Sequence, residues 1–226
     1  MRLLIDDADI QVIKALYEYY PIDGVTTNPS ILSKTQRKPY ETLGELREFL
    51  GPESELHVQV ISSKAEDMVA EAEMILRRVG DATYIKIPAV PEGIKAIKLL
   101  AERGCHTTAT AVYTPMQAYM AAKSGASYVA PYVNRIDNLG GDGVETVCKI
   151  QEILKANELK TKVLAASFKN VRQVEELCKI GIGAATASPS VIEAFLDNAS
   201  VREAVGRFNR DFEKLCGEGR TMLEAE

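Results

Sequence analysis

Histidine, aromatic side chains and concentrated charge are all scarce in this chain of 226 residues. There is no tryptophan, and His57 and His106 are the only histidines, which argues against a metal centre built from several imidazoles. The net charge is −5, from 27 basic and 32 acidic residues, and neither sign gathers in a run. We therefore expect a small-molecule substrate, with no nucleic acid and no membrane as partner.

Paired cysteines and long apolar segments are missing as well. Cys105, Cys148, Cys178 and Cys216 are widely spaced and form no C-x-x-C motif, so we expect reduced thiols rather than a zinc site or a disulfide framework. The amino-terminal "MRLLIDDADI" does not fit a signal peptide, and no apolar stretch is long enough to span a bilayer. The sequence predicts a cytoplasmic protein without a bound metal.

Eight short apolar runs, each of strand length, alternate with amphipathic stretches. The runs lie near residues 2–6, 24–27, 56–61, 83–88, 106–112, 127–133, 162–167 and 182–187. Between them, apolar residues recur at helical intervals in 9–20, 66–79, 92–104, 115–125, 143–157 and 171–181. Strand and helix in regular alternation predict parallel strands joined by helical crossovers.

Eight such units in a chain of this length predict an α/β fold of the (β/α)8 TIM barrel type. An open doubly wound sheet is the alternative, but its first strand is normally followed by a glycine-rich phosphate loop, and "DDADIQ" is not one. With 46% hydrophobic residues, the chain can form one large core, so we predict a single domain over residues 1–226.

An additional amphipathic helix is predicted at about 200–216, after the eighth unit. Its apolar residues at helical spacing are Val201, Val205, Phe208, Phe212 and Leu215. Such a stripe needs a surface to cover it. Either the barrel of the same chain or a neighbouring subunit could supply that surface.

Lys86 interrupts an otherwise apolar strand, between Ile85 and Ile87. An ammonium in such surroundings is costly unless it is paired with a buried carboxylate, reaches water or is neutral. Because side chains alternate along a strand, Lys86 points into the barrel if the two isoleucines pack against helices. A desolvated lysine loses proton affinity, and the neutral amine can attack a ketone to form a Schiff base without metal or cofactor.

Other polar residues gather at the predicted carboxyl ends of the strands, where (β/α)8 barrels have their active sites. They are Asp6, Thr27, Asn28, Gln59, Thr110, Tyr132, Arg135 and Ser167, with Lys169 close behind. Schiff-base chemistry needs a group that moves protons during imine formation and a second acid/base near the bond that breaks. Asp6 and Tyr132 have suitable chemistry for these two tasks.

Each of these residues also has a purely structural interpretation. Asp6 and Asn28 could cap the helices that follow them. Thr110 and Ser167 are of types common at strand ends, and Tyr132 could be a core aromatic with a wet hydroxyl. Arg135 and Lys169 could be loop residues whose charges face solvent.

Six motifs connect the candidates to a known family. In chain order they are "GVTTNPSIL", "VQVIS", "IKIP", "TATAVY", "APYVNRID" and "AASFK". They resemble the transaldolase-like family, and within it the fructose-6-phosphate aldolase branch, from Asp6 to about Phe168 and more loosely to the last helix. The resemblance implies a (β/α)8 barrel with cofactor-free class I aldol chemistry. It also implies a ring-like homo-oligomer, a decamer if it follows the family, with the C-terminal helix packed on a neighbouring subunit.

The resemblance implies a role for each candidate. Lys86 is the imine-forming lysine, Tyr132 the phenol that acts as acid/base, and Asp6 the catalytic aspartate after the first strand. The remaining roles are Gln59 and Thr110 as holders of the catalytic water, Thr27 and Asn28 as substrate-binding residues, and Arg135, Ser167 and Lys169 as phosphate-binding residues.

Two positions favour an aldolase over a transaldolase. Transaldolases of this type usually have glutamate in place of Gln59 and phenylalanine in place of Tyr132. A phenol at 132 can protonate the enamine and release a free ketone. We therefore expect reversible cleavage of fructose 6-phosphate, or a similar ketose phosphate, to dihydroxyacetone and glyceraldehyde 3-phosphate. The alternatives are a transaldolase that transfers a dihydroxyacetone unit between sugar phosphates, and a sugar-phosphate-binding barrel without turnover.

Four departures from the family pattern bear on specificity. Asp7 replaces the usual threonine, His57 stands where an aromatic residue is usual, and Thr108 stands where leucine is frequent. The segment 185–190 replaces a more apolar eighth strand. These departures leave the chemistry in place and the donor and acceptor preference open.

Overall fold

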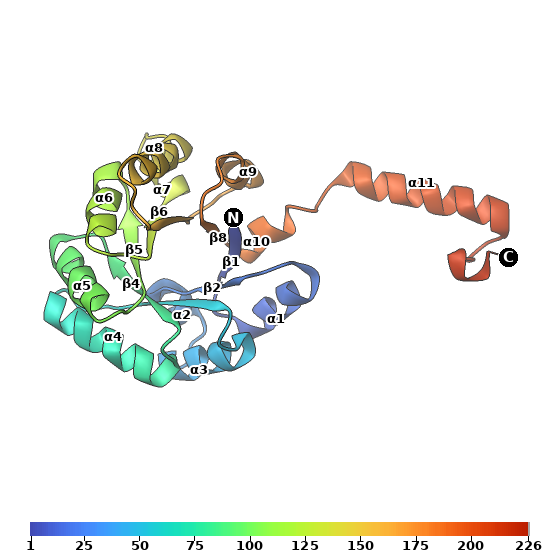
Figure 1. Cartoon of the computed structure of the whole chain (residues 1–226). Coiled ribbons are helices and arrows are strands. Elements are labelled where there is room, and N and C mark those ends of the chain that lie inside the picture. Colours follow the sequence, from blue (N-terminus) through green and yellow to red (C-terminus); the bar gives the residue numbers. More distant parts are fainter. Residues whose placement is uncertain (226) are drawn as a thin grey trace. The chain divides into compact units, whose positions relative to one another are not determined.

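A closed barrel of eight parallel strands dominates the structure, a computed structural model that describes residues 1–225 (Figure 1). The strands are β1 (Arg2–Asp6), β2 (Gly24–Thr26), β3 (Glu55–Gln59), β4 (Thr83–Pro88), β5 (Thr107–Val112), β6 (Tyr128–Pro131), β7 (Lys162–Ala165) and β8 (Ala184–Ala187). Strand β1 pairs with both β2 and β8, which closes the sheet. The predicted (β/α)8 barrel is confirmed, and the open doubly wound sheet is excluded.

Helices connect successive strands and lie around the barrel, and the last of them follows β8 (Figure 1). They are α1 (Ile10–Tyr19), α2 (Pro29–Lys34), α3 (Pro39–Leu50), α4 (Ala65–Val79), α5 (Pro91–Glu102), α6 (Pro115–Lys123), α7 (Val133–Asn138), α8 (Gly143–Ala156), α9 (Val171–Lys179) and α10 (Pro189–Glu193). The six helices predicted from apolar periodicity are all present. Helix α3 was not predicted, although its buried Leu43, Leu46 and Leu50 follow helical spacing, because Gly44 and several charged residues interrupt the pattern.

Side-chain caps explain where several helices begin. Asp9 accepts the backbone N–H groups of Gln11 and Val12 at the start of α1, and Asn28 accepts the N–H of Ile31 at the start of α2. Such caps pair donors that the first helical turn would otherwise leave unsatisfied. Since Asp9 caps α1, the capping interpretation of Asp6 is wrong.

Strand β4 shows how the alternation orients its side chains. Ile85 and Ile87 are completely buried, and Ile87 lies under α5, where a Cβ added at Gly93 would be 1.9 Å from the carbonyl oxygen of Pro88. Only glycine therefore allows α5 to approach the strand this closely. With the isoleucines directed at the helices, Lys86 points into the barrel.

A second compact unit follows Ile192 and contains α11 (Ala199–Cys216) and a short 3₁₀ helix (Met222–Glu224). No residue of α11 is buried. The predictions of a single domain and of a neighbouring subunit that packs against α11 stay predictions. Among the helices of residues 1–225, none has the length and apolar character that a membrane crossing requires.

Candidate active site

Lys86 lies in the interior of the barrel and is only 5% exposed. Its Nζ donates a hydrogen bond of 2.7 Å to the backbone carbonyl oxygen of Thr27, so its close partner is a neutral oxygen and not a carboxylate. Burial lowers the pKa of Lys86, the negative charge of Asp6 opposes this shift, and the positive charge of Arg135 adds to it. A larger fraction of Lys86 is therefore the neutral, nucleophilic amine than for an exposed lysine.

Asp6 ends β1 and is oriented by a chain of two threonines. The Thr26 Oγ1 hydroxyl donates to Asp6 Oδ1 at 2.7 Å and also lies 2.7 Å from Thr186 Oγ1 on β8. Because Thr26 has one hydroxyl proton and gives it to the carboxylate, Thr186 must donate to Thr26. These two hydrogen bonds fix Oδ1 of Asp6 and do not involve Oδ2.

Tyr132 is held from two sides at the end of β6. Its hydroxyl lies 2.8 Å from Thr110 Oγ1, and the guanidinium of Arg135 lies over its ring, 4.6 Å from the centroid. The ring of Tyr113 meets it edge-on at 5.7 Å between centroids. The phenol is therefore fixed in place, and Arg135 contacts the site rather than solvent alone.

Two non-glycine residues near this group have positive φ. Ala111 has a φ of 54°, at a register shift between β5 and β6, and Ser167 has a φ of 62°. Such residues are uncommon and often occur at functional sites, and a bulge redirects the side chains beside it. The carbonyl oxygen of Ser167 accepts the N–H of Asn134 at 2.7 Å, which brings the loop after β7 against α7, the helix that contains Arg135.

The two predicted substrate-binding residues after β2 use their polar atoms differently. The Thr27 hydroxyl donates to the His57 carbonyl oxygen at 3.0 Å, so Thr27 faces Lys86 with its own carbonyl. Asn28 is the N-cap of α2, through Oδ1, as one of its two interpretations predicted. That bond leaves the Nδ2 amide as the donor that Asn28 can offer to a ligand.

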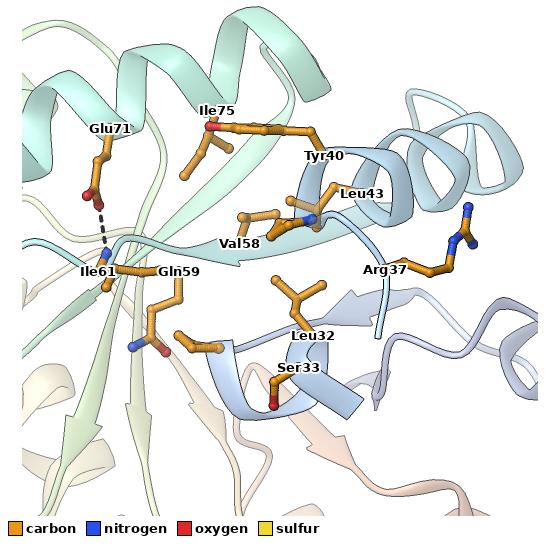
Figure 2. Close-up of a pocket in the computed structure, with 12 residues that line it drawn as sticks. Leu32, Ser33, Arg37, Tyr40, Leu43, Val58, Gln59, Ile61, Glu71 and Ile75 are labelled. Carbon is orange, nitrogen blue, oxygen red and sulfur yellow. Dashed lines mark hydrogen bonds between the residues drawn. The ribbon is translucent and has the colours of Figure 1, made fainter. Parts of the chain in front are cut away.

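Gln59 ends β3 as the register partner of Lys86. It borders a mainly apolar cavity of about 350 Å³ between β3 and helices α2, α3 and α4. Figure 2 shows Leu32, Leu43 and Tyr40 around this cavity. Glu71 accepts the N–H of Ile61 at 2.6 Å and so holds the chain just after Gln59 (Figure 2).

Within the described part of the chain, Lys169 makes no side-chain hydrogen bond or ion pair with the other predicted site residues. Its side chain is exposed, and its backbone N–H donates to Gln173 at 2.7 Å. Gln173 in turn donates to Asp137 of α7. Lys169 therefore braces its loop against α7 through the backbone.

The sequence analysis missed a buried polar group on the inner face of the barrel. His57 and Thr108 were noted as departures from a family pattern, but their contacts were not foreseen: His57 contacts both Thr108 and Glu55. The alternation of Glu55, His57 and Gln59 along β3 was the available signal, because residues two apart share a face. Within residues 1–225, no group of three or more His, Cys, Asp or Glu side chains could hold a metal ion.

Comparison with known proteins gives two findings. The model of a family described as "Transaldolase/Fructose-6-phosphate aldolase" matches residues 3–222. A protein of Streptococcus pneumoniae (strain ATCC 700669 / Spain 23F-1), described as "Probable fructose-6-phosphate aldolase", is 38% identical over 213 residues, which cover 94% of this chain and 96% of the relative.

Proposed function

This chain belongs to the transaldolase/fructose-6-phosphate aldolase family and is an aldolase-type enzyme, and we propose that it is a class I aldolase acting through an imine at Lys86. Its proposed reaction is the reversible cleavage of fructose 6-phosphate, or a similar ketose phosphate, to dihydroxyacetone and glyceraldehyde 3-phosphate. The observation that carries the proposal is the buried Lys86, whose Nζ is bonded to a neutral carbonyl oxygen and whose pKa is lowered by burial.

In the first half of the reaction the neutral Lys86 amine attacks the ketone carbon. Asp6 transfers protons through its Oδ2 while the carbinolamine loses water to give a protonated imine. The Asp6 carboxylate, which has given its proton to the leaving water, then takes the proton of the C4 hydroxyl through Oδ2, and the C3–C4 bond breaks. Its electron pair moves toward the iminium nitrogen and forms an enamine, and the aldehyde product leaves.

In the second half the enamine must be protonated at carbon before the ketone can leave. The Tyr132 hydroxyl, oriented by Thr110 at 2.8 Å, is the proposed proton donor. Gln59 and Thr110 are proposed to hold the water that hydrolyses the resulting imine. Hydrolysis releases dihydroxyacetone, returns Lys86 to the amine and gives one proton back to the Tyr132 phenolate.

Arg135 and Ser167 are the proposed phosphate ligands, with Lys169 as a helper. The contact between the Ser167 loop and α7 supports the pairing of the first two, because it holds the loop against the helix that contains Arg135. Phosphate sites in (β/α)8 barrels are frequently formed by loops that follow the late strands.

The proposal is tested by two product assays on the same preparation. One measures free dihydroxyacetone from fructose 6-phosphate, and the other measures sedoheptulose 7-phosphate when erythrose 4-phosphate is added. We expect release to be the faster reaction, because Tyr132 can protonate the enamine. Faster transfer would make the protein a transaldolase, and binding of fructose 6-phosphate without either product would make it a binding barrel.

A second prediction concerns metal dependence. Imine chemistry at Lys86 needs no metal, so cleavage should proceed at the same rate before and after treatment with EDTA. The measurement is dihydroxyacetone release in EDTA, with and without added zinc. Loss of activity that zinc restores would indicate a metal-dependent aldolase instead.

A third prediction concerns association. We propose a homo-oligomer in which another copy covers the apolar face of α11, where Val201, Val205, Phe208 and Leu215 are between 49% and 82% exposed. Light scattering at micromolar concentration should give a mass that is a multiple of 24.8 kDa. Replacement Phe208→Glu should lower that mass, because it places a charge in an apolar interface.

The matched control for the association experiment is Asn209→Glu, which adds the same charge one position along α11, where the side chain is already polar and exposed. It should keep the wild-type mass. A monomeric wild-type protein would contradict the proposed assembly.

A further inference from the structure

Three buried polar side chains form a hydrogen-bonded chain inside the barrel, and the proposed mechanism uses none of them. His57 Nε2 lies 3.2 Å from Glu55 Oε2, and His57 Nδ1 lies 2.9 Å from Thr108 Oγ1. Glu55 and His57 are on β3, and Thr108 is on β5. His57 and Thr108 are completely buried, and Glu55 is 5% exposed. A buried carboxylate and imidazole are costly unless each polar atom is paired.

Glu55 is the charged end of this row of hydrogen-bonded side chains. Burial alone would raise its pKa, but hydrogen bonds from His57 and Tyr128 and the positive charge of Arg2 together lower it. The Tyr128 hydroxyl donates to Glu55 Oε1 at 3.0 Å, and the Arg2 guanidinium pairs with the same oxygen. Glu55 is therefore an anion and can only accept hydrogen bonds.

The anion determines the tautomer of His57. Since Glu55 can only accept, the proton of the neutral imidazole must be on Nε2. His57 Nδ1 is then an acceptor, and the single hydroxyl proton of Thr108 must be donated to it. The donors therefore run in one direction, from Thr108 to His57 to Glu55.

Charged groups on several strands raise or lower the pKa of His57. Burial lowers the pKa of His57, Glu55 raises it, and the positive charges of Lys86 and Arg2 lower it further. The other rings that pack against it are Tyr84, stacked at 4.6 Å, and Tyr128, tilted at 5.6 Å between centroids. The imidazole is therefore neutral at a pH where an exposed histidine is already protonated.

The hydrogen-bonded residues lie close to Lys86 in the barrel. Thr108 is level with Lys86, and His57 is nearer the amino-terminal ends of the strands. Thr108 is the register partner of Lys86 on β5, and His57 is two residues before Gln59, the register partner of Lys86 on β3. Register partners on neighbouring strands share a face of the sheet, so the Thr108 side chain flanks that of Lys86. Lys86 and His57 consequently share one barrel interior, in which two positive charges would repel each other.

We propose that His57 is a positioning residue for Lys86: anchored by Glu55, the neutral imidazole fixes the Thr108 hydroxyl beside Lys86 and keeps a second positive charge out of the barrel interior. The proposal rests on the imine chemistry proposed for Lys86. His57 itself touches neither substrate nor reacting atoms.

The first experiment measures the titration of His57 by NMR in protein labelled with ¹⁵N-histidine. The wild type at pH 7 should show a neutral ring protonated at Nε2. At the acidic pH at which the buried His57 gains its proton, Lys86 is itself protonated, so Lys86→Met removes a positive charge and the proton affinity of His57 should rise by about tenfold, as expected for a unit charge at an effective dielectric constant of about 20. The signal of the exposed His106 is the internal control for differences between the two samples.

Two results of the NMR experiment would overturn the proposal. One is an Nδ1–H tautomer or an imidazolium at pH 7, and the other is identical titration of His57 in the wild type and Lys86→Met. Neither readout requires turnover, so each remains decisive even if Lys86 forms no imine.

The second experiment measures how fast substrate and borohydride modify Lys86 in His57→Gln. The variant should fold, as checked by circular dichroism, because an amide can still donate to Glu55. The rate at which borohydride traps the imine at Lys86 should fall by about tenfold, because holding a reacting group in the right geometry contributes at least this much to its rate. Thr108→Val in the His57→Gln background should add little, since Thr108 acts through His57. Trapping at the wild-type rate in folded His57→Gln would limit His57 to a structural role and overturn the proposal.

Discussion

Replacing Lys86 by methionine abolishes the cleavage of fructose 6-phosphate, with an expected loss of roughly 10⁴-fold or more, as found when a covalent nucleophile is removed. The reason is that methionine has no amine with which to form the imine. Methionine has a similar length and suits the apolar interior. The main structural cost is that the carbonyl oxygen of Thr27 loses its donor, about 1 kcal/mol. The variant should therefore remain folded.

The measurement is dihydroxyacetone release by wild type and Lys86→Met, each checked for thermal stability. Lys98→Met is the matched control, because Lys98 is exposed on α5. It should retain wild-type activity. Turnover by Lys86→Met within tenfold of wild type would show that the reaction does not use an imine at this position.

Replacing Tyr132 by phenylalanine should lower dihydroxyacetone release by about 10² to 10⁴-fold, the usual contribution of a general acid or base. The change removes the hydroxyl that lies 2.8 Å from Thr110 and keeps the ring that lies under Arg135. Imine formation at Lys86 should be largely intact. Transfer of the three-carbon unit to erythrose 4-phosphate should fall less, because the enamine then attacks an aldehyde instead of taking a proton.

Tyr113→Phe is the control for this variant, since Tyr113 contacts the Tyr132 ring edge-on through its own ring. It should keep both activities. If Tyr132→Phe lost release and transfer to the same extent, the phenol would have a role common to both reactions. The preference for an aldolase over a transaldolase would then rest on the wrong residue.

The barrel could be predicted from the sequence because strands and helices have different periodicities. The range predicted for β4, residues 83–88, agrees with Thr83–Pro88, since Lys86 and Pro88 did not disturb its alternation. Helix α3 was missed because Gly44 breaks an otherwise helical stretch. Short elements such as α7 contain too few residues to show a period.

The side-chain contacts between strands could not be predicted from the sequence. Which hydroxyl Asp6 accepts depends on the approach of β2 and β8 to β1, and residues 6, 26 and 186 are far apart in the chain. The same holds for Thr108, which meets His57 across β4. Single polar residues in strands gave weak signals, and only the closed barrel shows that they form connected chains.

The most direct test of the account is to locate the covalent intermediate. Wild-type protein is incubated with fructose 6-phosphate and sodium borohydride, digested, and analysed by mass spectrometry, with Lys86→Met treated in parallel. We predict a stable adduct of the three-carbon unit on the peptide that contains Lys86, and no adduct in the variant. An adduct on another residue, or active wild-type protein without any adduct, would contradict imine catalysis at Lys86.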